Sequence, residues 1–319
     1  MVDDAATGLT PKPIDDDGAE SMTATHFSWL EAGQGLIQPK LDWSFLTRAQ
    51  LSCLRYTAES REIYAADISG VLYLMNQHGE VVHHIRDIKK VTHLEWSANG
   101  ELGLICQRGH VVRLLNRNFE SEWEAKFRED VRTISIAHQA DYLAVALSNS
   151  DTILYDRFKR KISRIKTVKE LDELHFAWEH KTIIGSSDVG LLCSFGLNGK
   201  LSWSKSPFRE ARQIGINSNA TRIYVTVPGQ GIQVFDDEGE KLGTYQLKGT
   251  PLLLSISPLG NRLAVVTSER YLLWMNSEGT ILWATRTNEH IASICCDGLG
   301  NQLLIGFEKG EICALSFEE

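Results

Sequence analysis

The chain has 319 residues, 43% hydrophobic and 23% charged, a composition that excludes a disordered, collagenous or disulfide-stapled protein. The formal net charge of -8 argues against a nucleic-acid partner, because the protein's own field repels a polyanion. No apolar run approaches the roughly 18 to 20 residues of a membrane-spanning helix, so we expect no membrane span.

The first 24 residues are acidic and poor in large apolar side chains. They carry six carboxylates, one lysine and two prolines, and they lack the basic start and apolar stretch of a secretion signal. We therefore predict that residues 1–24 are a disordered acidic tail and that the protein is cytoplasmic. The six cysteines lie mostly in apolar runs, as expected of reduced, buried thiols.

A 40-residue period runs through the rest of the chain. Units begin without gaps at residues 51, 91, 131, 171, 211, 251 and 291, and the last unit has only 29 residues. The fourth position of every unit is aliphatic: Leu54, Leu94, Ile134, Leu174, Ile214, Leu254 and Ile294. This regularity predicts a repeat protein.

Each unit contains four short apolar runs separated by turn-rich segments. In the sixth unit the runs are residues 253–256, 262–266, 271–275 and 280–285. Four strands with such short connections form an antiparallel meander, and runs that are apolar on both faces must be covered on both sides. Radial stacking of the sheets achieves this, so we predict an all-β fold, a seven-bladed β-propeller of four-stranded antiparallel blades.

The seventh unit stops after three strand-like runs, and an N-terminal segment supplies the fourth. Trp43 lies eight residues before the first unit, just as Trp123, Trp203 and Trp283 lie eight residues before later units. We predict that residues 41–47 form a strand that closes the last blade, which removes free sheet edges, and that residues 25–319 form a single propeller domain. The four tryptophans are interpreted as packing residues.

The ending Gly-x-aliphatic-x-Trp of residues 199–203, together with the run Gly-Val-Leu-Tyr-Leu at residues 70–74, resembles the repeats of WD-repeat-like and pyrroloquinoline-quinone-like (quinoprotein-like) propellers. The resemblance covers residues 41–319 and implies the fold. It implies no functional residue, because the chain has no Trp-Asp dipeptide and a single Gly-His, at Gly109-His110.

Adjacent Cys295 and Cys296 invite comparison with quinoprotein enzymes, in which such a pair stacks on the quinone. We interpret them instead as buried thiols, because Cys296 falls in an apolar column of the repeat and there are seven units rather than eight. His83 and His84, with nearby His78, form the closest histidine cluster. Consecutive strand residues point to opposite faces, so His83 and His84 cannot bind one metal ion from the same side. No hydrolase triad or phosphate-binding loop appears, so we predict no catalytic residue, no cofactor, no metal and no enzyme activity.

Two further groups of residues bear on function. His93, Glu95, Glu173 and His175 fall on the innermost strands and are expected to line the central channel. The third unit, residues 131–170, holds eight basic and four acidic residues, a net charge of +4 in a protein of -8. Connections between strands one and two and between strands three and four emerge on one face. That face is predicted to carry the partner-binding residues Phe119, Arg157, Phe158, Lys159, Arg160, Lys161 and Trp178.

These features predict a non-enzymatic protein-protein interaction scaffold that presents its loops to protein partners, with an acidic segment bound by blades two to four. Two alternatives remain open at this stage. In the first, the basic turn is only solvated surface, and its aromatic rings fold onto their own blades. In the second, the chain is an enzyme or small-ligand binder that uses the central channel.

Overall fold

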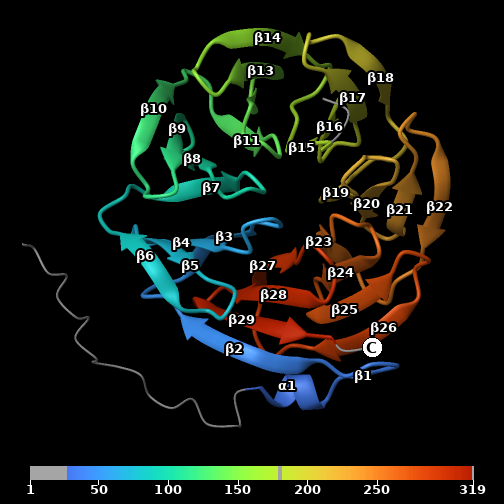
Figure 1. Ribbon diagram of the computed structural model, residues 1–319. Helices are drawn as coiled ribbons and strands as arrows, with labels where there is room; N and C mark the ends of the chain where they lie inside the picture. Colours follow the sequence, from blue (N-terminus) through green and yellow to red (C-terminus); the bar gives the residue numbers. More distant parts are fainter. Residues whose placement is uncertain (1–26, 179–181, 318–319) are drawn as a thin grey trace, which may run out of the picture.

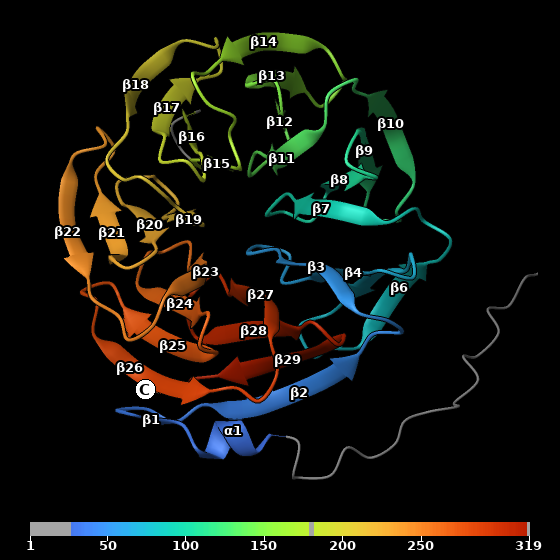
Figure 2. The same cartoon turned by 180° about the vertical axis from the view of Figure 1, so that it is seen from behind.

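The computed structural model describes residues 27–178 and 182–317 of the chain. Seven antiparallel sheets stand around a central axis, and Figures 1 and 2 show the ring from its two sides. The predicted seven-bladed β-propeller is therefore confirmed. The predicted disordered tail, residues 1–24, lies outside the described residues.

The first four blades each hold four consecutive strands, ordered from the channel outward. Blade one consists of β3 (Leu51–Tyr56), β4 (Ile63–Asp67), β5 (Leu72–Met75) and β6 (Val81–Ile85). Blade two consists of β7 (Val91–Trp96), β8 (Leu102–Gln107), β9 (Val111–Asn116) and β10 (Ser121–Lys126). Blade three consists of β11 (Val131–Ile136), β12 (Tyr142–Leu147), β13 (Asp151–Asp156) and β14 (Lys161–Lys166). Blade four consists of β15 (Glu173–Phe176), β16 (Thr182–Ser186), β17 (Leu192–Gly196) and β18 (Leu201–Lys205).

The last three blades complete the ring, and the final two recruit strands from the N-terminal region. Blade five consists of β19 (Ile214–Ile216), β20 (Ile223–Val227), β21 (Gly231–Phe235) and β22 (Lys241–Tyr245). Blade six consists of β23 (Pro251–Ile256), β24 (Arg262–Thr267), β25 (Tyr271–Asn276), β26 (Ile281–Arg286) and the added β1 (Gln34–Gly35). Blade seven consists of β27 (Ile291–Cys296), β28 (Gln302–Phe307), β29 (Glu311–Ser316) and β2 (Lys40–Leu46).

The hydrophobic core lies between the blades rather than in a single centre. The fourth-position side chains of the repeat are buried in it, and Leu54 and Leu94 are almost fully covered. At the junction of blades one and two, for example, Tyr64 stacks on Trp96 with ring centroids 3.7 Å apart. Each blade therefore needs a neighbour on both sides, which explains why the apolar runs of the repeat have no polar face.

Ring closure follows the prediction, with a strand that begins one residue earlier than expected. In β2, Trp43 pairs with Ala314 and Phe45 pairs with Ile312 of β29. The indole Nε1 of Trp43 also donates a hydrogen bond of 2.9 Å to the carbonyl of Gln77 in blade one. The strand thus completes blade seven, and its tryptophan ties that blade to the next.

The same tie recurs around the ring. Trp123 Nε1 donates to the carbonyl of Arg157 at 3.0 Å, and Trp203 Nε1 donates to that of Asp237 at 2.7 Å. In each case the outer strand of one blade bonds to the turn between the third and fourth strands of the next blade. These three tryptophans are therefore packing residues, as interpreted, that also anchor the neighbouring turn; Trp283 is fully buried but anchors no such turn.

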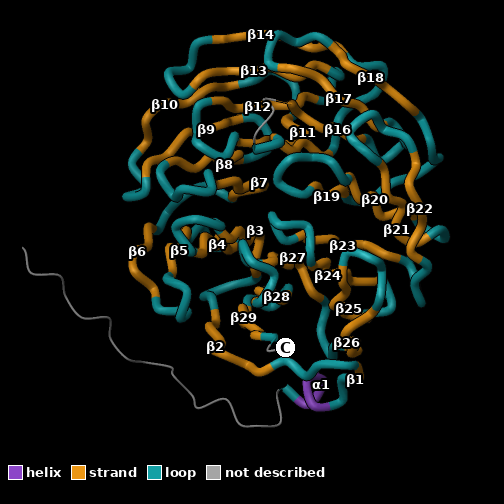
Figure 3. Tube along the Cα trace, turned by 45° about the vertical axis from the view of Figure 1, so that its right-hand side comes forward, coloured by secondary structure: helices purple, strands orange, loops and turns teal. Residues whose placement is uncertain are grey.

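Residues 27–37 lie outside the ring. The short helix α1 (Ser28–Glu31) and strand β1 run along the outer strand of blade six, as Figures 1 and 3 show. This arrangement was not predicted. Within the described residues, the single helix has four residues, far short of what crossing a membrane requires.

Candidate functional site

We call the face that carries the connections between strands one and two and between strands three and four the loop face. Phe158, in the turn between β13 and β14, and Trp178, two residues after the end of β15, both belong to it. The two residues come from neighbouring blades, three and four.

Phe158 stands at the tip of its turn and is 70% exposed. The turn is fixed from below by Asp156, whose Oδ1 accepts hydrogen bonds from the amides of Phe158 (3.0 Å) and Arg160 (2.8 Å). Burial opposes ionisation of Asp156, but these amides and the Arg160 guanidinium outweigh it and lower the pKa of the carboxyl. The turn residues therefore hold a large apolar ring out in solvent.

The positive charge around Phe158 is partly neutralised within the chain. Arg157 Nη2 lies 2.7 Å from Glu101 Oε1, and Arg160 Nε lies 2.5 Å from Asp156 Oδ2. Both guanidinium carbons stay close to the Phe158 ring, 5.8 and 5.7 Å from its centroid. The turn is thus less basic than its sequence suggests, and its exposed Lys161 contributes most to the charge available to a partner.

Lys159 is directed toward blade two. Its Nζ donates a hydrogen bond of 2.6 Å to the carbonyl of Glu124 and lies 5.9 Å from the Trp123 ring centroid. The backbone φ of Lys159 is +66°, at the repeat position that glycine occupies in several other blades. Its ammonium therefore lies at the edge of the turn rather than beside the tip of Phe158.

Phe119 was predicted to lie on the partner-binding surface, and the structure shows that this prediction is wrong. Its side chain is only 6% exposed and packs between blades one and two, 5.3 Å from His83 and 5.8 Å from Trp96 between ring centroids. It occupies the same repeat position as Lys159, Gly79 and Gly239, and a Cβ on either glycine would meet the tryptophan of the preceding blade's outer strand. An apolar ring directed there is covered, so Phe119 is not available to a partner.

Trp178 is partly exposed, at 36%, beside the central channel. It stacks on His138 of blade three with ring centroids 3.8 Å apart, and His138 Nε2 lies 2.7 Å from Glu59 Oε1. The Trp178 amide donates a hydrogen bond of 2.6 Å to the carbonyl of Ser218 in blade five. The inner loops of blades three, four and five are therefore connected side by side through Trp178.

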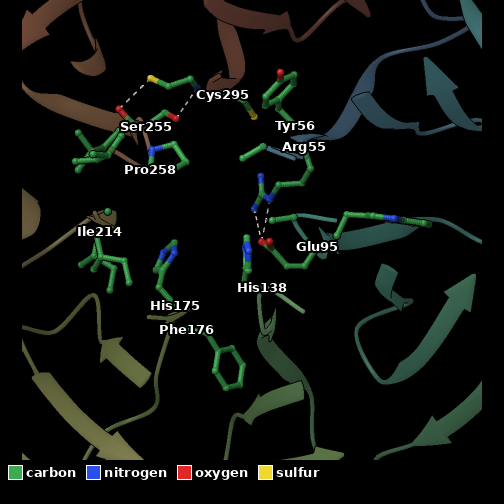
Figure 4. A pocket seen from close by; sticks show the side chains of 18 of the residues that line it. Arg55, Tyr56, Glu95, His138, His175, Phe176, Ile214, Ser255, Pro258 and Cys295 are labelled. Carbon is green, nitrogen blue, oxygen red and sulfur yellow. Dashed lines mark hydrogen bonds and ion pairs between the residues drawn. The ribbon is translucent and has the colours of Figure 1, made fainter. Parts of the chain in front are cut away.

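The central channel contains a cavity of about 250 Å³ beside Trp178, shown in Figure 4. The fifth residue of six of the seven repeats lines it, a regularity that was not recognised from the sequence although Glu95 and His175 were predicted to lie there: Arg55, Glu95, His175, Gly215, Ser255 and Cys295. Of the four predicted channel residues, Glu95, Glu173 and His175 line this cavity, whereas His93 lines a second cavity of about 190 Å³.

An ion pair joins the innermost strands of blades one and two at the channel wall. Arg55 donates from Nε (2.9 Å) and Nη2 (2.7 Å) to Glu95 Oε1, and Figure 4 shows the two side chains facing each other. Burial lowers the pKa of Arg55, but the Glu95 carboxylate more than compensates and raises it, so the guanidinium stays charged. The pKa of His93 is lowered, chiefly by burial and secondly by the positive charge of Arg55. The pair neutralises itself, which suits a structural role in the channel.

The adjacent cysteines face different neighbours. Cys295 Sγ lies 3.6 Å from the carbonyl of Leu54, whereas Cys296 Sγ lies 3.4 Å from that of Ser255. Burial raises the pKa of both thiols, so they are neutral at physiological pH. All six cysteines are free. Across residues 27–178 and 182–317, no three His, Cys, Asp or Glu side chains are placed to hold a metal ion.

Comparison with solved structures agrees that the chain folds as a β-propeller. The β-propeller domain of Cps50 (Swd1) from Myceliophteria thermophila superposes with a TM-score of 0.75 at 15% sequence identity, over 87% of this chain and 99% of that domain. At this identity the likeness establishes the fold alone. No protein-family model matches the sequence. No curated protein matches it either.

Proposed function

We propose that this chain is a non-enzymatic protein-interaction scaffold, and that a protein partner docks through an acidic segment on the loop face of blades three and four. The main support for this proposal is the exposed Phe158 ring, which stands in a turn that hydrogen bonds keep in place. Exposed aromatic side chains next to arginine are the residues that contribute most to protein interfaces. Six cysteines that form no disulfide support the cytoplasm as the compartment.

The binding surface consists of Arg157, Phe158, Arg160 and Lys161 in blade three, Trp178 in blade four, and Lys159 at its edge. Because Arg157 and Arg160 already contact Glu101 and Asp156, an acidic partner segment must share or replace these carboxylates. The electrostatic contribution to affinity should therefore be modest, and Phe158 should act as the main anchor.

A pull-down with quantitative mass spectrometry tests the proposal. Proteins captured by the wild type should be lost on Phe158→Ala and reduced on Lys161→Glu, while the melting temperature stays unchanged because both side chains are exposed. The matched control replaces exposed lysines in the corresponding turn region of blades four and five, Lys200→Glu and Lys241→Glu. If Phe158→Ala captures the same proteins as the wild type, the proposal is wrong.

The second candidate is a small-ligand binder that uses the channel, favoured by the cavity lined by Arg55, Glu173 and His175. It predicts that His175→Ala, but not Phe158→Ala, abolishes the thermal stabilisation produced by a bound metabolite. A thermal shift assay with a metabolite library on the wild type, His175→Ala and Phe158→Ala distinguishes the small-ligand binder from the protein scaffold.

A further inference from the structure

Residues 27–37, which we call the N-terminal strap, are bound to the outer edge of blade six (Figures 1 and 3). Trp29 is its anchor: the side chain is only 4% exposed and lies 5.9 Å from Phe307 between ring centroids. The hydroxyl of Thr285 on β26 donates a hydrogen bond to the carbonyl of Trp29. The strap therefore fills a notch between blades six and seven.

Beyond the anchor, the strap is held by its backbone. Gln34 and Gly35 pair with β26, and the amide of Leu36 donates a hydrogen bond of 2.7 Å to the carbonyl of Leu282. Two glycines make this approach possible, since a Cβ on Gly33 would lie 2.3 Å from Trp283 Nε1 and one on Gly35 would lie 2.1 Å from the Leu282 carbonyl oxygen. Main-chain pairing at a sheet edge with one deep aromatic pocket is how proteins bind extended peptides.

The repeat explains why this edge is open to a ligand. In other blades the aromatic residue of the outer strand lies against the turn glycine of the next blade: Trp43 against Gly79, Trp203 against Gly239 and Tyr245 against Gly279. Blade seven has no such turn, because β29 and β2 are not consecutive in the chain. Gly33 of the strap takes that place against Trp283, which leaves the strap in a position that a covalent turn fills elsewhere.

We propose that the edge of blade six is a peptide-binding site, and that residues 27–37 occupy it as an exchangeable internal ligand. The site is formed by β26 with Trp283, Thr285 and Phe307. Its ligand is an extended peptide with a tryptophan followed by glycines four and six residues later, the pattern of Trp29, Gly33 and Gly35. The site is separate from the loop face and does not depend on the function proposed there.

Fluorescence polarisation with a labelled synthetic peptide of residues 27–38 tests the proposal on the full chain. In Trp29→Ala protein the internal ligand has lost its anchor, so the peptide should bind saturably. Wild-type protein should bind it more weakly, because its own strap competes at a millimolar effective concentration. A Trp29→Ala peptide should bind roughly 30-fold more weakly or worse. A Leu36→Ala peptide is the matched control, because Leu36 is 78% exposed and its removal should leave affinity unchanged.

A second receptor guards against a Trp29→Ala protein that does not fold. In Gly35→Ala the new Cβ clashes with the Leu282 carbonyl and weakens the backbone pairing of the strap, while the residues around Trp29 are unchanged, so this protein should bind the peptide more tightly than the wild type does. Binding of the original peptide and its Trp29→Ala form with equal affinity overturns the proposal, as does a failure of both peptides to bind either folded variant.

Discussion

Replacing Trp43 by alanine tests whether a non-covalent strand closes the ring. Trp43 is half-buried, so about half of the 3 to 5 kcal/mol typical of a buried aromatic truncation should be lost, about 2 kcal/mol. Losing the hydrogen bond to Gln77 adds about 1 kcal/mol. For a 319-residue chain the unfolding entropy is about 0.7 kcal/mol/K, so a loss of about 3 kcal/mol lowers the melting temperature by about 4 °C.

Calorimetry measures that shift, and hydrogen exchange locates it. The matched control is Trp203→Ala, which removes an equivalent hydrogen bond, to Asp237, from a blade whose strands are consecutive in the chain. Both variants should have a lower melting temperature than the wild type, but only Trp43→Ala should speed amide exchange across β2 and β29. The closure argument fails if Trp43→Ala melts within about 1 °C of the wild type, or if β2 exchanges no faster than it does in Trp203→Ala.

Three further predictions concern the tail, the thiols and the channel. Deleting residues 1–24 should leave the melting temperature unchanged in calorimetry, whereas deleting residues 1–48 should lower it; an equal effect of the two deletions would contradict the domain boundaries. Burial raises the pKa of Cys53 to about 11 and that of Cys193 to about 12, so at pH 8 about one such thiol in a thousand or fewer is ionised. Iodoacetamide should therefore label the folded chain far more slowly than the urea-unfolded chain, and equal labelling rates in mass spectrometry would show that the thiols are accessible. Arg55→Leu should lower the urea midpoint more than the double change Arg55→Leu with Glu95→Leu, because the single change leaves a half-buried carboxylate without its partner; the reverse order would exclude a self-neutralising pair.

The sequence predicts the fold well because burial on both faces repeats at a fixed interval. The first strands of blades one, two, three, six and seven begin at the expected starts of their units, whereas β15 and β19 begin two and three residues later than residues 171 and 211. The channel was predictable too, since equivalent positions of adjacent repeats meet at the axis. Arg55 and Glu95 are 40 residues apart for this reason.

The parts of the site that escaped prediction depend on contacts between blades. Phe119 and Lys159 share the repeat position of Gly79 and Gly239, and a side chain there points to the preceding blade. A side chain at this repeat position points toward the neighbouring blade, so an aromatic ring there is predicted to be covered, as Phe119 is. The strap has no such signal, because it follows no period and its partners on β26 lie about 250 residues away.

The same inter-blade contacts bear on how the loop face could bind. Trp123 Nε1 holds the carbonyl of Arg157 at 3.0 Å, so blade two fixes the turn that presents Phe158. Asp156 fixes the same turn from within blade three. A side chain held in place before binding loses little conformational entropy when a partner arrives, so more of its contact energy appears as affinity. A tip residue of this propeller is therefore better suited to anchor a partner than an equally exposed residue on a free loop.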